Sequence, residues 1–310
     1  MVLLNFHLNR TNMFSKLDEL FGQAKFSKKR MALAVAQDEH SIEAALIAHH
    51  KGIIELVCVG DKEQIEKIAI ENKLDFTGIE IINEKDKNVA VEIAIKLVKN
   101  GNAQILMKGN ISTSILLKGV LNKDWGLNIG NLLSHFAIFE VKAYHKLLGI
   151  TDVAMNIAPN LKEKTGIINN AVNFLAKIGI QNPKIAVVSA VETVSESMPS
   201  TMDAAILSKM AERGQIGKCI IDGPLAFDNA ISKVSAEHKG IVSKVAGDAD
   251  ILLMPDIEAG NILYKTLGFF TDSKLAAVIL GAKCPIVLTS RADSEDAKLN
   301  SIYLAALGSN

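Results

Sequence analysis

The sequence predicts an α/β protein that has mainly parallel β-sheet and two domains. Short apolar runs rich in β-branched residues alternate with amphipathic segments, which is the pattern of repeated β–α–β units. The 310 residues exceed the usual length of one domain, so a division into two is expected. The chain is 49% apolar but only 5% aromatic, so its core must consist mainly of Ile, Leu, Val and Ala. Such a core favours helices layered on a sheet.

The predicted strands are apolar runs that are too short for an average helix. In chain order they are 31–36, 53–59, 79–82, 104–107, 135–141, 147–151, 184–189, 218–222, 250–254, 276–280 and 285–289.

Helical patterns fill the intervals between these strands. The clearest are 40–50, 62–72, 87–99, 161–178 and 201–212, and a further one from Met13 to Lys25 precedes the first strand. Segment 161–178 shows the pattern well, because its apolar residues fall on one helical face: Ile167, Ile168, Ala171, Val172, Leu175 and Ile178. Two more helices are expected, one after residue 113 and one at the end of the chain.

Polar residues gather where predicted strands end, first in KGNIST at 108–113. A strand that ends in Gly and Ser/Thr before a helix exposes backbone N–H groups and the positive end of the helix dipole, which suits an anion. Lys108 and Lys118 would add positive charge. Alternatively, Ser112 or Thr113 only caps the helix. The segment is not a P-loop, because GxxxxGK[ST] is absent.

A second polar segment, TSRADS at 289–294, follows the last predicted strand. The carboxyl ends of parallel strands are where open α/β sheets bind ligands, and Arg291 offers a planar fork for phosphate. Alternatively, Ser290 is a helix N-cap and Asp293 completes a capping box.

Two further polar segments, 222–228 and 256–261, also follow predicted strands. Their Gly-Pro and Gly-Asn pairs are typical of turns, and a single Asp after a strand is more often a cap than a catalyst. Four polar strand ends in one chain nevertheless favour binding, because loops at one end of a sheet share a cleft.

Charge and cysteine content exclude several classes of function. Lys+Arg and Asp+Glu both number 34, so the composition gives no reason to expect a nucleic-acid partner. Cys58, Cys219 and Cys284 lie in apolar runs without CxxC or CxxH spacing, which argues against disulfides and structural zinc. No apolar run approaches the roughly 18 residues of a membrane-spanning helix. We therefore expect a soluble cytoplasmic protein with no membrane partner.

Histidines and nucleotide motifs give no further site. His135 and His238 have no partner at metal-ligand spacing and are expected to be hydrogen-bonded scaffold residues, while His49 and His50 complement a helix dipole. The GxSxG elbow of hydrolases and the GxGxxG fingerprint of dinucleotide sites are both missing.

Nine motifs, in order along the chain, together resemble the phosphate acetyl/butyryl transferase family, and its butyryl branch most. The resemblance runs from about residue 14 to 304. The motifs occupy 108–123, 133–141, 151–161, 168–172, 197–216, 222–232, 238–241, 246–265 and 281–294.

The resemblance implies a fold, a reaction and partners. The fold would be two Rossmann-like α/β domains with an interdomain cleft, similar to isocitrate/isopropylmalate dehydrogenases, formed by 1–144 plus 285–310 and by 145–284. The reaction would be the reversible transfer of a short-chain acyl group, preferably butyryl, between CoA and orthophosphate. Coenzyme A would be a substrate, with no tightly bound cofactor and no metal. A homodimer or higher homo-oligomer is expected.

The resemblance also assigns residue roles. Arg291 would clamp phosphate and Ser290 would hydrogen-bond the acyl-transfer centre. In the first loop, Ser112 and Thr113 would contact CoA or phosphate with Lys108, Gly109 and Lys118, the last standing where the acetyl branch has Arg. Glu258 and Asn261, from the EAGN signature, would form the opposite cleft wall. The acetyl branch has a catalytic Asp where direct spacing places Ala297, so Asp296 and Asp293 are the candidate bases.

Three alternatives remain at this point. Acetyl-CoA could be the preferred substrate, because chain-length preference depends on pocket volume. The chain could be a non-catalytic CoA- or anion-binding relative, although the intact Ser290–Arg291 pair argues against it. A nicotinamide-dependent dehydrogenase is disfavoured by the missing dinucleotide signature.

Overall fold

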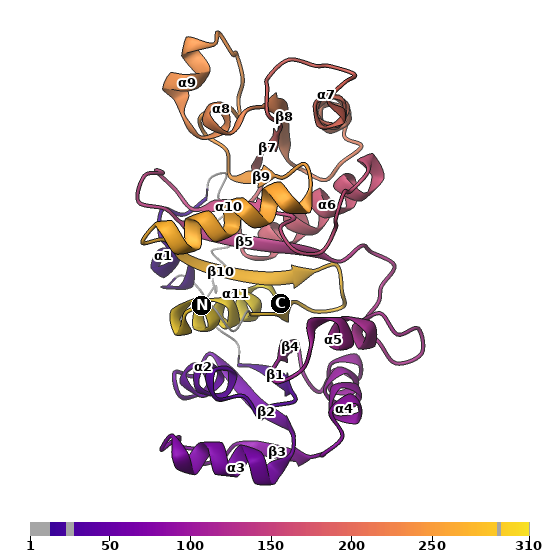
Figure 1. Cartoon of the computed structure of the whole chain (residues 1–310), viewed down its shortest axis with the longest axis vertical. Helices are drawn as coiled ribbons and strands as arrows, with labels where there is room; N and C mark the ends of the chain where they lie inside the picture. Colours follow the sequence, from indigo (N-terminus) through magenta and orange to yellow (C-terminus); the bar gives the residue numbers. More distant parts are fainter. Residues whose placement is uncertain (1–12, 23–27, 290–292, 310) are drawn as a thin grey trace, which may run out of the picture. The chain divides into compact units, whose positions relative to one another are not determined.

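The computed structural model describes residues 13–22, 28–289 and 293–309 (Figure 1). It divides into two compact units: unit 1 is Met1–Leu20 with Ser134–Lys274, and unit 2 is Phe21–Leu133 with Leu275–Asn310. These divisions differ from the predicted domain boundaries at 144/145 and 284/285, which stay a prediction. None of the described helices is both long and apolar enough to cross a bilayer.

Unit 2 contains a mostly parallel sheet with the strand order β3-β2-β1-β4-β11-β10. Only β10 runs antiparallel to its neighbour β11. The strands are β1 (Lys29–Ala34), β2 (Ile54–Gly60), β3 (Glu80–Asn83), β4 (Ile105–Lys108), β10 (Lys274–Leu280) and β11 (Ile286–Val287). Ala32, Leu33 and Ala34 of β1 are fully buried, as expected for a strand covered on both faces.

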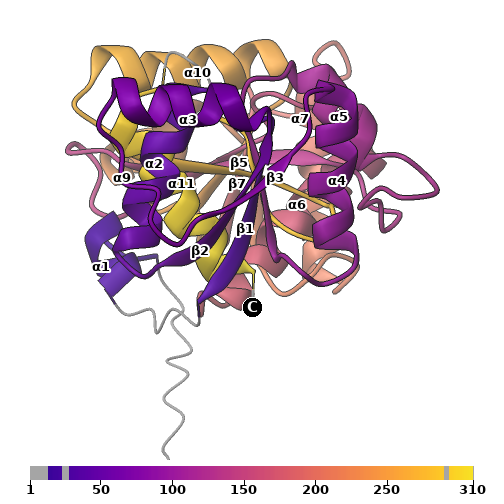
Figure 2. The same cartoon turned by 90° about the horizontal axis from the view of Figure 1, so that it is seen from below.

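Helices cover both faces of this sheet. In Figures 1 and 2, α2, α3 and α11 lie on one side of β1 and β2, and α4 and α5 lie on the other. The helices are α2 (Glu39–His50), α3 (Lys62–Glu71), α4 (Lys87–Lys99), α5 (Thr113–Val120) and α11 (Glu295–Gly308). The short α1 (Leu17–Gly22) spans the division between the units.

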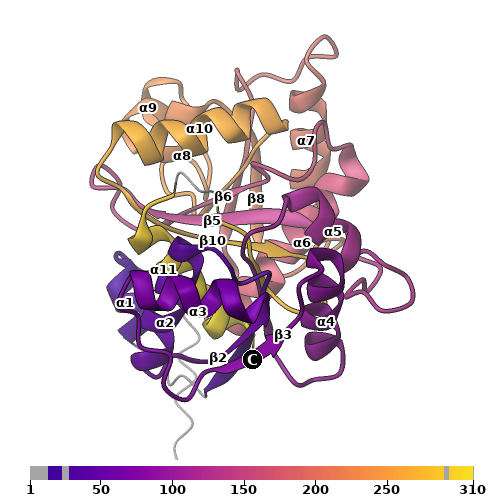
Figure 3. The ribbon, with the colours of Figure 1, turned by 60° about the horizontal axis from the view of Figure 1, so that its bottom comes forward.

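Unit 1 contains strands in the order β5-β6-β9-β7-β8. β5 is antiparallel to β6, and the others are parallel. Figure 3 shows α6 and α7 on one side of these strands and α8, α9 and α10 on the other. The elements are β5 (Ser134–Glu140), β6 (Leu148–Thr151), α6 (Leu161–Lys177), β7 (Lys184–Val188), α7 (Pro199–Glu212), β8 (Ile220–Leu225), α8 (Phe227–Ile231), α9 (Lys233–His238), β9 (Ile251–Leu253) and α10 (Ile257–Phe270).

The structure confirms the mixed α/β class, the mostly parallel sheet and every predicted strand, but it corrects two of the polar strand ends. Asp222–Leu225 is part of β8, because this outermost strand of unit 1 tolerates Pro224 and the β7–β8 register shifts between Ala186 and Val188. Residues 257–261 are the beginning of α10 rather than a turn.

Candidate active site

The segments after β4 and β11 leave the sheet of unit 2 side by side. Leu106 pairs with Ile286 and Met107 with Val287 in a parallel register, so both strands end at the same edge, here called the carboxyl edge. This pairing agrees with the predicted convergence of segments 108–113 and 290–294 within one unit, which stays a prediction. Ser290 and Arg291 themselves lie outside the described residues.

Gly109 brings the first loop against the end of β1. Its N–H donates to Ala34 O at 2.9 Å, and Asn110 N–H donates to Val35 O at 2.7 Å. A Cβ atom on Gly109 would lie 2.3 Å from Val35 O, which no side chain tolerates. The glycine predicted in this loop is therefore required by the close approach of two backbones.

The two predicted lysines have different positions relative to this loop. Lys108 Nζ donates to Gly109 O and to Ile111 O, each at 3.2 Å, so its positive charge lies within the loop. Lys118 is exposed in the last turn of α5, at the end of the helix remote from Ser112. The structure thus groups Lys108, but not Lys118, with the loop.

Serine residues cap the two helices that follow these loops. Ser112 Oγ accepts from Ile115 N–H at 3.3 Å, and Thr113 is the first residue of α5. Ser294 Oγ accepts from Ala297 N–H at 3.1 Å and caps α11. The alternative in which Ser290 caps this helix is wrong, since the cap is Ser294, four residues later.

The charge of the caps distinguishes these two helices from others at the carboxyl edge. α2, α3 and α4 follow β1, β2 and β3, and their caps are Asp38, Asp61 and Asp86. An aspartate neutralises the positive end of a helix dipole. The neutral Ser112 leaves that of α5 available, because the first turn of α5 has no acidic residue, whereas Glu295 and Asp296 offset that of α11. An anion at this edge is therefore favoured beside α5.

The two candidate bases lie at the start of α11. Asp296 is exposed in its first turn. Asp293 precedes the cap, and its carbonyl oxygen accepts from Lys298 Nζ at 2.6 Å. Lys298 is almost fully buried, so this bond anchors the end of the 290–294 segment to the helix.

The EAGN signature forms the first turns of α10 in unit 1. Asp256 caps the helix by accepting from Ala259 N–H at 2.8 Å. A Cβ on Gly260 would lie 2.5 Å from Asp152 O, and Asn261 Nδ2 donates to Val153 O at 3.2 Å. Gly260 and Asn261 therefore hold α10 against segment 152–153, whereas Glu258 is exposed.

Asp152 and His135 lie together at the carboxyl edge of unit 1 and were not among the predicted site residues. The Asp152 carboxylate accepts from Ala154 N–H at 2.9 Å, Met155 N–H at 3.0 Å and Asn156 Nδ2 at 2.5 Å. His135 is the second residue of β5, which is antiparallel to β6, so it lies at the edge where β6 ends. Thr151 Oγ1 donates to His135 O at 2.8 Å. The matched motifs at 133–141 and 151–161 were the available signal.

His135 is a neutral, buried imidazole. Burial lowers its pKa to about 4, although the Asp152 carboxylate acts in the opposite direction. Its Nδ1 atom has no hydrogen-bond partner among the described residues, so the expected hydrogen-bonded scaffold role is not seen for that atom.

Within the described chain, the buried polar side-chain atoms without hydrogen-bond partners lie at corresponding edges of the two units. They are Gln37 Oε1 after β1, Ser189 Oγ after β7, Asn229 Oδ1 after β8 and His135 Nδ1. Each lies at the carboxyl edge of the parallel strands in its own unit. Such atoms destabilise a fold by about 1–3 kcal/mol each. Their concentration marks the two carboxyl edges as the incompletely satisfied, ligand-competent sides of the sheets.

At the opposite edge of unit 1, by contrast, charged side chains pair with one another. Lys146 Nζ lies 2.6 Å from Asp250 Oδ1 and 2.9 Å from Asp248 Oδ1, and Lys184 also bonds to Asp248. Burial alone would raise the pKa of Asp248, but hydrogen bonds from Lys184, Lys146 and His145 lower it well below its usual range.

Two of the three thiols, those of Cys58 and Cys219, lack the properties of nucleophiles. Burial raises the pKa of Cys58 to about 12 and that of Cys219 to about 11. Cys284 is buried, and the three cysteines form no disulfide with one another. The prediction from their apolar surroundings is confirmed for Cys58 and Cys219.

Comparisons with known proteins give one consistent result. The family model described as "Phosphate acetyl/butaryl transferase" matches residues 15–92 and 87–306. A phosphate butyryltransferase of Clostridium acetobutylicum is 48% identical over 95% of this chain and 98% of that protein. A phosphate acetyltransferase of Thermotoga maritima is 44% identical over 94% of this chain and 99% of that protein. The crystal structure of a branched-chain phosphotransacylase from Enterococcus faecalis is 32% identical, with a TM-score of 0.79 over 91% of this chain and 99% of that one.

Proposed function

The chain belongs to the phosphate acetyl/butyryl transferase family, and from this premise we propose that it transfers a short-chain acyl group reversibly between CoA and orthophosphate. The observation that carries the proposal is the parallel pairing of β4 with β11. It supports a single anion site, because both loops start at one edge of the sheet, beside α5, which has a neutral serine cap and no acidic residue in its first turn.

We assign the transfer to residues around that edge. Arg291 would clamp the phosphate with two parallel hydrogen bonds, and Ser290 would hydrogen-bond the acyl-transfer centre. Lys108, Gly109, Ser112 and Thr113 would bind phosphate or CoA through charge and the first-turn amides of α5. Lys118, Glu258 and Asn261 stay in the proposed substrate-binding set, although Asn261 already serves to hold Val153.

The transfer needs alignment and charge neutralisation more than a covalent relay. In one direction the CoA sulfur attacks the acyl phosphate carbonyl, a C–S bond forms, and the C–O bond to phosphate breaks. Asp296 or Asp293 would take the thiol proton, while Arg291 and the 108–113 backbone steady the departing phosphate. In reverse, a phosphate oxygen attacks the thioester. The chemistry itself requires no metal and no tightly bound cofactor.

Butyryl preference is proposed because the relatives named phosphate butyryltransferase include one 48% identical to this chain. Acetyl preference is the second candidate, since a 44% identical relative is named phosphate acetyltransferase. The two differ in the volume of the acyl pocket and not in phosphate handling. Two methylene groups in an apolar pocket are worth about 1–3 kcal/mol, or tens-fold in kcat/KM.

The remaining features are proposed from the family resemblance. They are two Rossmann-like domains with an intervening cleft, similar to isocitrate/isopropylmalate dehydrogenases, a homodimeric assembly and a cytoplasmic location.

The test is phosphate-dependent release of CoA from acetyl-, propionyl-, butyryl- and isobutyryl-CoA by the purified chain. We expect saturable release with the highest kcat/KM for butyryl-CoA. Acetyl-CoA equalling or exceeding butyryl-CoA would assign the chain to the acetyl branch. CoA binding without phosphate-dependent release of CoA from any substrate would indicate a non-catalytic relative.

A further inference from the structure

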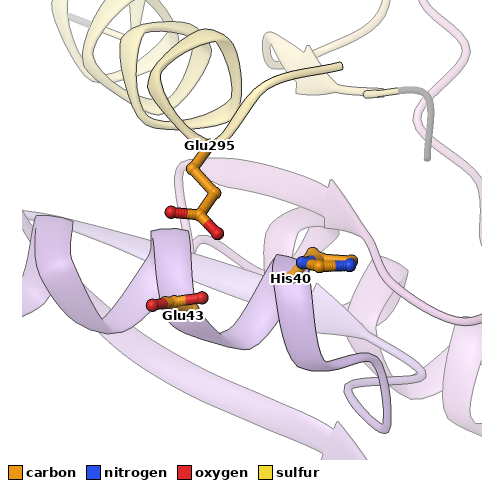
Figure 4. Close-up of side chains that lie close together, drawn as sticks. All are labelled: His40, Glu43 and Glu295. Atoms are coloured by element: carbon orange, nitrogen blue, oxygen red, sulfur yellow. The ribbon is translucent and has the colours of Figure 1, made fainter. Parts of the chain in front are cut away.

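One group of side chains at the start of α2 and α11 has the composition and spacing of a metal site. The donor atoms of His40, Glu43 and Glu295 all lie within 4.8 Å of one another. Figure 4 shows Glu295 reaching toward the helix that carries His40 and Glu43. All three residues belong to unit 2, and the transfer chemistry proposed above gives them no role.

The two helices place these donors on a firm support. His40 and Glu43 are three residues apart on α2, so they share one face of that helix. Glu295 is the first residue of α11, which packs against α2. Both helices bury small residues, which permits a close approach: Ala44, Ala45 and Ala48 on α2, and Ser301 and Ala305 on α11. Donors on packed helices keep their spacing better than donors on loops.

The charges in this cluster have no counterpart in the described chain. None of the three side chains makes a hydrogen bond or ion pair with a described residue. The neighbouring carboxylates of Asp248 and Asp250 differ in this respect, because Lys146 and Lys184 form ion pairs with them. Glu43 and Glu295 thus have adjacent negative charges that no described lysine or arginine contacts. A cation from solution can supply the missing charge, since His40 and Glu295 are exposed.

We propose that His40, Glu43 and Glu295 bind one zinc ion. An imidazole nitrogen favours zinc over magnesium and calcium, which prefer sites made only of oxygen. Zinc is commonly held by three such protein ligands and a water molecule at about 2.0–2.2 Å, which spaces the donors of a tetrahedral site about 3.3 Å apart. Small rotamer changes of these side chains bring donors from within 4.8 Å to that spacing.

The test is calorimetric titration of the metal-free, full-length protein with Zn²⁺ alone. We expect one ion per chain, and we expect His40→Ala and Glu295→Gln each to weaken the dissociation constant by about tenfold or more. The matched control is Glu39→Gln, which removes a carboxylate from the same helical turn outside the cluster and should keep wild-type affinity. Thermal melts establish that each variant is folded.

Cobalt substitution gives an independent readout. Co²⁺ bound by one nitrogen and oxygen ligands should give visible absorption without sulfur charge-transfer bands, and His40→Ala should abolish it. The proposal is overturned if the wild type binds no zinc, if His40→Ala and Glu295→Gln bind zinc as tightly as Glu39→Gln, or if cobalt shows sulfur ligation. None of these outcomes depends on whether the chain transfers acyl groups.

Discussion

Lys146 and Asp250 form a buried ion pair in unit 1, with Nζ 2.6 Å from Oδ1. Asp250 is completely buried and also accepts from Lys184 N–H at 2.7 Å. The pair precedes β6 and β9, and the second bond reaches the first residue of β7. Three neighbouring strands of unit 1 are therefore joined at the edge opposite its carboxyl edge.

Lys146→Met should lower the free energy of unfolding by about 3–5 kcal/mol, because it leaves a buried carboxylate without its charged partner. Lys142→Met is the matched control, since Lys142 pairs with Asp272 at 2.8 Å on the exposed surface, and its loss should change the free energy of unfolding far less. Urea unfolding of both variants measures the difference. Equal losses in the two variants would show that burial does not strengthen the Lys146 pair.

His135 should make stability fall in mild acid. Its pKa is about 4 in the folded chain against an ordinary 6.5, so the unfolded chain takes up a proton first as the pH drops. The loss begins near pH 6.5, grows to roughly 3 kcal/mol near pH 4, and is absent above pH 7.5. His135→Asn should remove this component from the unfolding free energy measured across that range. The exposed His238→Asn should retain it, and a His135→Asn profile parallel to wild type would contradict the assignment.

Gly109→Ala should disrupt the first loop, because the new Cβ would lie 2.3 Å from Val35 O. We expect the free energy of unfolding to fall by about 1–3 kcal/mol. We also expect the folded variant to lose most of its phosphate-dependent activity, because the amides of α5 move with the loop. Gly22→Ala serves as the control, since nothing lies within 4 Å of its Cβ position. Unchanged activity in a folded Gly109→Ala variant would remove this loop from the site.

Arg291→Gln should slow turnover by about two to three decades without unfolding the chain, since a developing phosphate charge loses on the order of 2–4 kcal/mol of stabilisation. Steady-state kinetics with butyryl-CoA and phosphate, together with circular dichroism, test this. A folded variant with a near-normal rate would exclude Arg291 from the mechanism.

Replacing Cys58, Cys219 and Cys284 together by Ala should leave a folded enzyme with substantial activity, because the raised pKa values of Cys58 and Cys219 disfavour a thiolate. Kinetics should require both substrates bound together. Ping-pong kinetics, or labelled acyl groups trapped on Cys284 without phosphate, would instead establish a covalent relay.

The strands were predictable because each is a short apolar run that the sheet buries, whereas the beginning of α10 was not. Residues 258–261 resemble a turn in sequence, and the reason for Gly260 lies in Asp152 O, more than a hundred residues earlier. Local patterns contain no information about such a contact.

The candidate site was predictable in its loops and only partly in its members. The Gly-Ser/Thr and Ser-Arg segments were evident from their positions after strands. His135 was not, because it lies near the start of its strand, and it is at the carboxyl edge only because β5 runs antiparallel to β6. Strand direction is set by long-range pairing, so a sequence pattern alone does not reveal it.

The position of β11 between β4 and β10 has a consequence for biosynthesis. Unit 1 is complete once residue 274 has left the ribosome, whereas unit 2 still needs residues 275–310 to fill the interior of its sheet. The unit whose amino-terminal strands are made first is therefore the last to fold. Until then, one edge of β4 has unpaired backbone N–H and C=O groups that can pair with a strand of another chain. A chaperone that shields this early intermediate would therefore protect the nascent chain from aggregation.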